Sequence, residues 1–260
     1  SFFGNGFMWE CPDYLKFDDK GVLIFTPQGL KAEGDKYKNI FQSGYLIGEN
    51  IDFSNGEFKH GEFTELDRGF DFYAPQTFED SKGRRIVIGW MGVPDAIEHK
   101  NPTIDNFWQH QLTIPRELVL KNNKIYQIPI AELETLRKGN SFKKEISLNE
   151  VAILDIFESN TFELDFNFKE CDEFKIELRE DCNLSFNNGV FKLQLGKSGY
   201  GRNMRAVEIN NVKSLRVFSD NSSLEVFLNE GEEVFTTRIY NDKIDSKLKL
   251  SGSGTVEVEK

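Results

Sequence analysis

Two stretches of the sequence, 63 residues apart, repeat one pattern of strand, turn and strand. The first runs from Pro12 to Gly21 as PDYLKFDDKG before VLIF. The second runs from Pro75 to Gly83 as PQTFEDSKG before two arginines and IVIGW. Self-similarity of this kind is the signature of repeated supersecondary units. Each copy predicts a hairpin at the inner half of a β-propeller blade, whose usual span is ~40 to 50 residues with room for insertions.

The number of blades that this chain can supply is small. A propeller needs at least about four blades to close around its channel, and residues 1–119 have room for two or three. The predicted ring is therefore incomplete and would expose unpaired strand edges, which favour aggregation. We expect a propeller segment outside this chain, or a second polypeptide, to complete it.

The rest of the chain also predicts strands, which makes this an all-β protein. Short runs rich in Val, Ile, Phe, Tyr and Thr recur between Gly, Asn and Asp clusters. Alternating segments such as TFELDFNF and SLEVFL predict an antiparallel β-sandwich over 140–260. Between the two parts, PIAELETLRKG starts with Pro129, carries acids early and bases late, and ends at Gly139, as a short helix does. We therefore predict blades over 1–119, a linker with this helix over 120–139, and the sandwich.

Charge and cysteine content exclude several classes of function. The 43 acidic and 32 basic residues give a net charge of −11, whereas nucleic acids and anionic membranes select basic faces. No apolar stretch approaches the ~20 residues that span a bilayer. Three cysteines without a CxxC pair predict neither a disulfide framework nor a zinc site. The histidines are scattered and are expected to be structural or exposed, so no metal or cofactor is expected; they are His60, His99 and His110.

The repeat singles out one acidic side chain. Glu10 and Tyr73 hold equivalent places, each two residues before the proline of its hairpin. If the hairpins are equivalent blades, the carboxyl and the phenol converge at one mouth of the channel. Met8, Trp9 and Cys11 surround the carboxyl with apolar groups, which disfavour its charged form and suit a proton donor. The alternative is an ordinary exposed carboxylate, as most glutamates are.

Five motifs follow one another along most of the chain, and together they resemble those of glycoside hydrolase family 32, the family of invertases, sucrose-6-phosphate hydrolases and fructanases. The motifs are MWECPD at 8–13, DFYAPQTF at 71–78, IGWMG at 88–92, the LTIPREL run at 112–118, and LRVFSDNSSLEVFLNEG at 215–231 followed by TRIY. The resemblance implies a five-bladed propeller followed by a β-sandwich. It also implies retaining hydrolysis of terminal β-D-fructofuranosides.

The resemblance assigns the general acid/base to the Glu of the ECP motif, which is Glu10 here. Retaining hydrolysis also needs a carboxylate ~5 to 5.5 Å away that attacks the anomeric carbon. In the family this nucleophile belongs to an Asn-Asp-Pro motif, and a stabilising Asp belongs to an Arg-Asp-Pro motif. Neither string occurs in these 260 residues. We therefore expect one of three catalytic carboxyls in this chain, and no hydrolysis by the chain alone.

The same motifs suggest residues that contact the sugar. Asp71 matches a family Asp that holds sugar hydroxyls, although it could be a turn residue, and Tyr73 belongs to the same motif. Trp90 would offer a flat face to a sugar ring, or it could pack within its blade. Cys11 could tune the acidity of its neighbour through a weak hydrogen bond, or be a small buried hydrophobe. Arg116 is expected to be a packing and ion-pair residue without a catalytic part.

The expected function is an intracellular fructosidase that cleaves sucrose or sucrose 6-phosphate. The acidic balance, the cysteines without a disulfide pattern and the lack of surface anchors favour the cytoplasm and, within the family, the phosphorylated sugar. One alternative is a non-catalytic, lectin-like carbohydrate-binding protein, and another is an extracellular fructan hydrolase. The expected partners are a small sugar and the remaining propeller segment, and the sandwich could mediate a homodimer.

Overall fold

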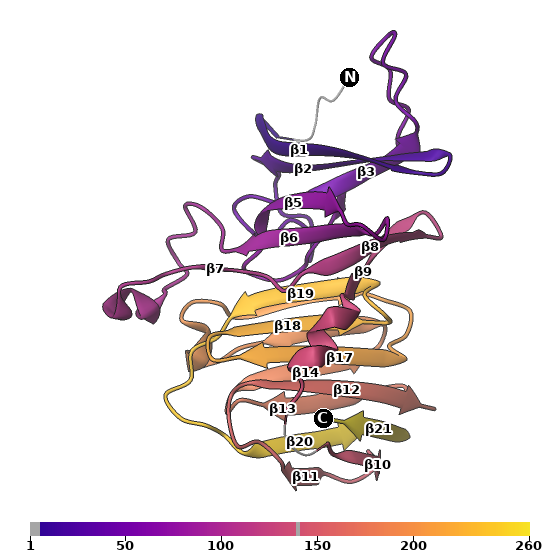
Figure 1. Ribbon diagram of the computed structural model, residues 1–260. Helices are drawn as coiled ribbons and strands as arrows, with labels where there is room; N and C mark the ends of the chain where they lie inside the picture. The colour runs from indigo at the N-terminus through magenta and orange to yellow at the C-terminus, as the bar shows by residue number, and fades with distance from the viewer. Residues whose placement is uncertain (1–5, 139–140) are drawn as a thin grey trace.

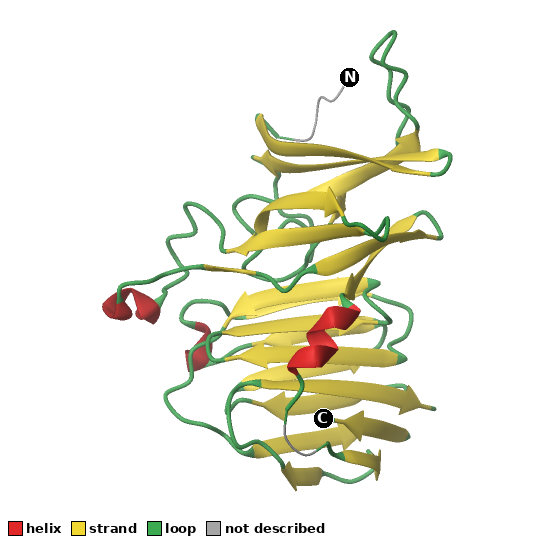
Figure 2. Cartoon of the chain, viewed as in Figure 1, coloured by secondary structure: helices red, strands yellow, loops and turns green. Residues whose placement is uncertain are grey.

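Strands dominate the computed structural model of the chain, which describes residues 6–138 and 141–260 (Figure 2). The described helices are three short 3-10 turns: η1 (Pro102–Asn106), η2 (Ala131–Leu136) and η3 (Lys197–Gly199). The predicted all-β class is thus confirmed. None of the described helices is long and apolar enough to span a bilayer.

Two antiparallel sheets form two propeller blades, one above the other in Figure 1. The first contains β1 (Met8–Phe17), β2 (Lys20–Gln28), β3 (Gly44–Glu49) and β4 (Thr64–Glu65). The second contains β5 (Tyr73–Glu79), β6 (Arg85–Met91), β8 (Arg116–Lys121) and β9 (Lys124–Pro129), with β7 (Gln111–Leu112) beside β6. The repeated hairpins of the sequence are β1–β2 and β5–β6. The blades share one apolar cluster that includes Leu15, Ile24, Phe72 and Val87.

The second blade extends further along the chain than predicted. Strands β8 and β9 pair as a hairpin through Asn122 and Asn123, which both have positive φ angles of 52° and 57°. Asn tolerates this conformation, and two such residues in a row suit a two-residue hairpin turn. The predicted linker of 120–139 is corrected accordingly, because its first ten residues belong to the blade. Helix η2 follows, within the range predicted to be helical, and Gly139 lies outside the described residues.

Two six-stranded antiparallel sheets form the C-terminal β-sandwich. Alternate residues of each strand point into one apolar core, as Phe162, Leu164 and Phe166 do. The first sheet runs in the order β10 (Lys143–Ser147), β21 (Thr255–Glu259), β12 (Phe162–Lys169), β17 (Ser214–Asp220), β18 (Ser223–Leu228), β19 (Glu233–Arg238). The second runs β11 (Ala152–Asp155), β20 (Lys247–Gly252), β13 (Phe174–Leu178), β14 (Cys182–Asn187), β15 (Val190–Gln194), β16 (Met204–Glu208).

The propeller segment before β5 covers the edge of the sandwich at β19. The backbone N–H of Arg68 donates to the carbonyl of Val234 at 2.7 Å, and that of Phe70 donates to the carbonyl of Thr236 at 2.9 Å. A Cβ on Gly69 would lie 2.0 Å from the carbonyl oxygen of Thr236, so only glycine permits this approach. Every residue of β19 is buried, and so is every residue of the neighbouring β18. An edge strand that would otherwise expose unpaired backbone groups is therefore covered.

A buried arginine lies at the centre of this interdomain contact. The Nη1 atom of Arg116 on β8 lies 3.1 Å from Asp67 Oδ2, and its Nη2 atom lies 2.5 Å from Glu225 Oε2 and 2.6 Å from Thr236 Oγ1. Its side chain is completely buried. The PREL and SLEVFL motifs thus meet in one ion-pair network, and the ion-pair role expected for Arg116 is confirmed.

Candidate active site

Glu10 and Tyr73 reach equivalent positions because β1 and β5 are interrupted in the same way. Each strand shifts register just after this residue. The residues that follow them, Cys11 and Ala74, have φ angles of 50° and 45°, and a proline comes next in both strands. A bulge of this kind bends the strand and redirects the side chains beside it. The sequence repeat therefore extends to the backbone conformation, and it aims both side chains at the same place.

The structure brings Glu10 and Tyr73 into direct contact. The Tyr73 hydroxyl donates to Glu10 Oε2 at 2.9 Å. The side-chain amide of Gln28 donates to the same oxygen at 3.1 Å, and its nitrogen lies 3.3 Å from the Tyr73 oxygen. The hydroxyl of Thr26 donates to the main-chain carbonyl of Glu10 at 2.9 Å. Glu10 is nevertheless exposed, so its carboxyl is held on one side and open to solvent on the other.

Aromatic rings line the neighbouring wall of the site. Tyr73 pairs with Trp90 across β5 and β6, with ring centroids 6.4 Å apart, and His110 packs edge-on against Trp90 at 4.9 Å. Burial raises the pKa of Tyr73, and the neighbouring Glu10 carboxylate raises it further, against the opposing hydrogen bond from Gln28. The phenol therefore keeps its proton at neutral pH and acts as a donor. Trp90 is half-buried, so part of its surface is left for a ligand.

Cys11 serves the site through its backbone. The thiol is free and half-buried, and its left-handed φ is part of the bulge that orients the preceding residue. Within the described residues, Glu10 Oε2 accepts hydrogen bonds from Tyr73 and Gln28, and none is given by the Cys11 thiol. An effect of this thiol on the acidity of Glu10 stays a prediction.

Asp71 lies in the contact between the domains, although the resemblance implied a role in holding sugar. Its Oδ2 and Oδ1 atoms accept hydrogen bonds from Arg202 Nε at 2.6 Å and Nη2 at 2.8 Å, and the Arg238 N–H donates to Oδ2 at 2.8 Å. The residue is only 2% exposed. Both oxygens are thus occupied by residues of the sandwich. This burial argues against direct contact with a sugar, because the turn after Gly69 delivers the carboxylate to the sandwich.

The Asp71–Arg202 pair predicts that the folded state is sensitive to acid. Burial by itself raises the pKa of Asp71, but the charge and hydrogen bonds of Arg202 and the N–H of Arg238 outweigh it and hold the pKa below its ordinary value. The ordinary value is about 3.9 in an unfolded chain. A carboxyl with a lowered folded-state pKa stabilises the fold above that value, and this stabilisation is lost as the pH falls through the folded-state pKa.

We expect Asp71→Asn to lower the free energy of unfolding by about 2 kcal/mol at neutral pH, because charge-assisted hydrogen bonds are lost. The melting temperature of the variant should also fall less steeply than that of the wild type below about pH 4. Calorimetry between pH 2.5 and 7 measures both effects, with Asp105→Asn on the exposed part of η1 as a control. Equal acid dependence in the wild type and Asp71→Asn would contradict this role.

Two histidines lie near these residues without forming a metal centre. His99 packs edge-on against Phe70, and burial lowers its pKa; burial also lowers the pKa of His110, beside Trp90. Over residues 6–138 and 141–260, no group of three or more His, Cys, Asp or Glu side chains is arranged to hold a metal ion.

Sequence reasoning missed Gln28 and Thr26. Both belong to the strand that pairs with the ECP motif, in the run FTPQG at 25–29. Pairing outward from the DDKG turn would place Pro27 opposite Glu10, whereas the bulge moves the pairing by one residue and places Thr26 there. A one-residue shift exchanges the two faces of a strand. The Cys-Pro pair after Glu10 marks the bulge, and allowing for this bulge in the pairing would have predicted that Gln28 lies near Glu10.

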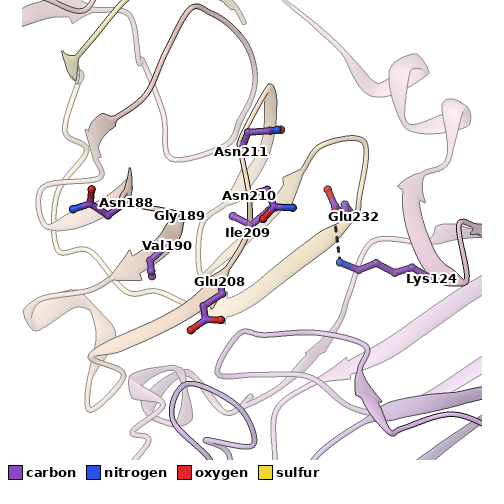
Figure 3. A pocket seen from close by; sticks show the side chains of 9 residues that line it. All are labelled: Lys124, Asn188, Gly189, Val190, Glu208, Ile209, Asn210, Asn211 and Glu232. Carbon is purple, nitrogen blue, oxygen red and sulfur yellow. Dashed lines mark hydrogen bonds and ion pairs between the residues drawn. The ribbon is translucent and has the colours of Figure 1, made fainter.

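A polar cavity of about 690 Å³ lies elsewhere, between the second blade and turns of the sandwich (Figure 3). Lys124 of β9 forms an ion pair with Glu232 across it at 3.5 Å. None of the residues expected in the active site lines this cavity, and its lining has no aromatic ring on which a sugar could stack. Its lining residues are Lys124, Asn188, Gly189, Val190, Glu208, Ile209, Asn210, Asn211 and Glu232.

Two family models match consecutive parts of the chain. The N-terminal domain of glycosyl hydrolases family 32 matches residues 2–129, and the C-terminal domain of the same family matches residues 132–260. The chain belongs to glycosyl hydrolase family 32. The boundary between the two family matches agrees with the end of the second blade at Pro129.

Relatives of this family 32 chain include curated bacterial proteins. The chain is 40% identical to the sucrose-6-phosphate hydrolase of Bacillus subtilis (strain 168) over 261 residues, which cover 97% of this chain and 53% of that protein. It is 37% identical to the sucrose-6-phosphate hydrolase of Escherichia coli, over 98% of this chain and 54% of that protein. The chain thus spans about half the length of these relatives.

Solved structures of family 32 enzymes have the same fold. A β-fructofuranosidase of Bombyx mori aligns with a TM-score of 0.80 at 30% identity, covering all of this chain and 55% of that protein. The sucrose-6-phosphate hydrolase of Lactobacillus gasseri aligns with a TM-score of 0.85 at 25% identity, over 98% of this chain and 55% of that protein. The fold of this chain is therefore part of a β-propeller followed by a β-sandwich.

Proposed function

We propose that this chain carries the acid/base part of a retaining β-fructofuranosidase active site, with Glu10 as the general acid/base. One observation carries the proposal: an exposed carboxyl stands at the start of the first strand of a blade, with one oxygen held by Tyr73 and Gln28. Trp90 lies against the same tyrosine and offers an apolar face to a sugar ring. Glu10 would protonate the glycosidic oxygen and then deprotonate the water that releases fructose.

The remaining catalytic groups come from a propeller segment that these residues do not include. Retaining hydrolysis needs a nucleophilic carboxylate on the other side of the anomeric carbon. The Asn-Asp-Pro and Arg-Asp-Pro strings that carry such groups in the family do not occur in this sequence. The structure describes two blades, whereas a closed propeller requires at least about four blades. We therefore expect activity only when the other half of the propeller is present.

The proposed substrate is sucrose or its 6-phosphate, with the phosphorylated sugar preferred. The names of the curated bacterial relatives support this preference. Because the net charge of the chain is −11, binding of an anionic substrate requires a basic group close to the site. We assign no Arg or Lys of this chain to the phosphate.

The test is to co-express this chain with the part of the Bacillus subtilis relative that it does not span, and to measure release of fructose. We expect no turnover by the chain alone, and a higher kcat/KM of the complemented enzyme for sucrose 6-phosphate than for sucrose. A complemented protein that binds these sugars without turnover, with equal affinity in the wild type and Glu10→Gln, would instead identify a lectin-like module.

A further inference from the structure

The carboxyl of Glu10 is bound asymmetrically. Both side-chain donors, the Tyr73 hydroxyl and the Gln28 amide, reach Oε2, at 2.9 and 3.1 Å. No hydrogen bond to Oε1 is found within the described residues. The two oxygens of this carboxyl are therefore not equivalent, and Oε1 is left to face a substrate.

The orientation of the Gln28 amide follows from the chemistry of its neighbours. An ionised carboxylate only accepts hydrogen bonds, so the amide must turn its NH₂ group toward Glu10. The same NH₂ group lies 3.3 Å from the Tyr73 oxygen. Because that oxygen accepts from Gln28, the single proton of the hydroxyl is directed to Glu10. Gln28 thus contacts the carboxylate and also orients its second donor.

The fold holds Gln28 firmly in this position. It is the last residue of β2 and pairs with Met8, and its carbonyl accepts the backbone N–H of Phe7 at 2.8 Å. The side chain is half-buried beside the aromatic wall. A donor on a paired strand has little freedom to leave its partner, as a residue that supports a reacting group requires.

We propose that Gln28 is a positioning residue. Together with Tyr73 it holds Oε2 of Glu10 as a hydrogen-bond acceptor. Oε1 is then the oxygen that gives and takes the catalytic proton. This inference rests on the proposed function, because it describes how the same acid/base is held. A neutral amide suits this role, since it fixes the carboxyl without placing a permanent charge beside it.

The chain itself provides the decisive test by NMR. The side-chain amide signal of Gln28, assigned by its loss in Gln28→Leu, should move when acid is added to the protein. That movement should disappear in Glu10→Gln. The amide of Gln76 is the matched control, because its nitrogen donates to the main-chain carbonyl of Pro75 at 2.9 Å and, among the described residues, to no carboxylate. A Gln28 signal that moves no more than that of Gln76 would overturn the proposal.

The phenol of Tyr73 provides a second readout. The hydrogen bond from Gln28 lowers the pKa of Tyr73 against the effect of burial. Gln28→Leu should therefore raise this pKa further, whereas Gln76→Leu should leave it unchanged. Spectra of ¹³C-labelled tyrosine, with Tyr73→Phe to assign the signal, measure the difference. Identical titrations in the two Leu variants would contradict the contact.

Kinetics separate this inference from the proposed function. In the complemented enzyme, Gln28→Leu should lower kcat for sucrose about tenfold, with a smaller change in KM, because one hydrogen bond to the reacting group is lost. The loss should be smaller with a nitrophenyl leaving group, which needs less help from an acid. If Glu10→Gln has full activity, the proposed function fails. If Glu10→Gln is inactive and Gln28→Leu behaves as Gln76→Leu does, only the role of Gln28 fails.

Discussion

Glu10→Gln should lower kcat of the complemented enzyme for sucrose 6-phosphate by about 10²- to 10⁴-fold, the usual contribution of a general acid/base. The amide has nearly the same shape as the carboxyl and can still accept from Tyr73 and Gln28, but it has no proton to transfer. KM should change far less than kcat, because the aromatic wall at Trp90 remains. Steady-state kinetics over a range of pH measure both quantities.

Glu49→Gln is the matched control for this change. Glu49 is an exposed residue of the same blade, and it pairs with Lys20 at the turn end of β2, whereas Glu10 pairs near the opposite end of that strand. We expect normal kcat in this variant. An equal loss in both variants would show that removing any charge from the blade disturbs activity, and would contradict a specific role for Glu10.

Arg116→Met should lower the free energy of unfolding by about 3 to 5 kcal/mol, as when one partner of a buried ion pair is removed. The guanidinium is completely buried between Asp67 and Glu225. Its removal leaves two carboxylates in the interdomain contact without their cation. Thermal and urea unfolding measure the change, with Arg85→Met as the control. Arg85 forms a partly exposed pair with Glu79 at 3.2 Å, which should contribute less than about 1 kcal/mol.

The decrease in the free energy of unfolding caused by Arg116→Met should become larger as the pH rises. Burial raises the pKa of Glu225, and Arg116 opposes this rise. Without the arginine, the folded-state pKa rises further above the unfolded value of about 4.3. The folded variant then holds a proton that the unfolded chain releases, so its stability falls as the pH rises through this window. The double change Arg116→Met and Glu225→Gln should recover part of the loss at pH 7. A deficit independent of pH and of Glu225 would contradict a charge-based cause.

The repeat is the reason that the centre of the site could be predicted from the sequence. Equivalent hairpins impose equivalent backbone positions, so the spacing of Glu10 and Tyr73 was enough to predict their convergence. The alternation of apolar residues predicted the sandwich for the same reason, because the period of a strand determines which side chains enter the core.

The role of Asp71 could not be predicted in this way. Its motif indicated a sugar contact, whereas its partner Arg202 lies 131 residues further along the chain. No local pattern reveals which distant cation a buried carboxylate will meet. Gln28 escaped prediction for a different reason, since the bulge at Cys11 changes which face of β2 meets Glu10.

Chemical rescue of Glu10→Ala tests the assignment of the acid/base most directly. The complemented variant is given p-nitrophenyl β-D-fructofuranoside, whose leaving group needs little protonation, in the presence of azide. Azide attacks the sugar–enzyme intermediate without needing a base. We expect the rate to rise with azide concentration and the product to be β-fructosyl azide. A rate that azide does not change, with fructose as the sole product, would contradict the role of Glu10 as the acid/base.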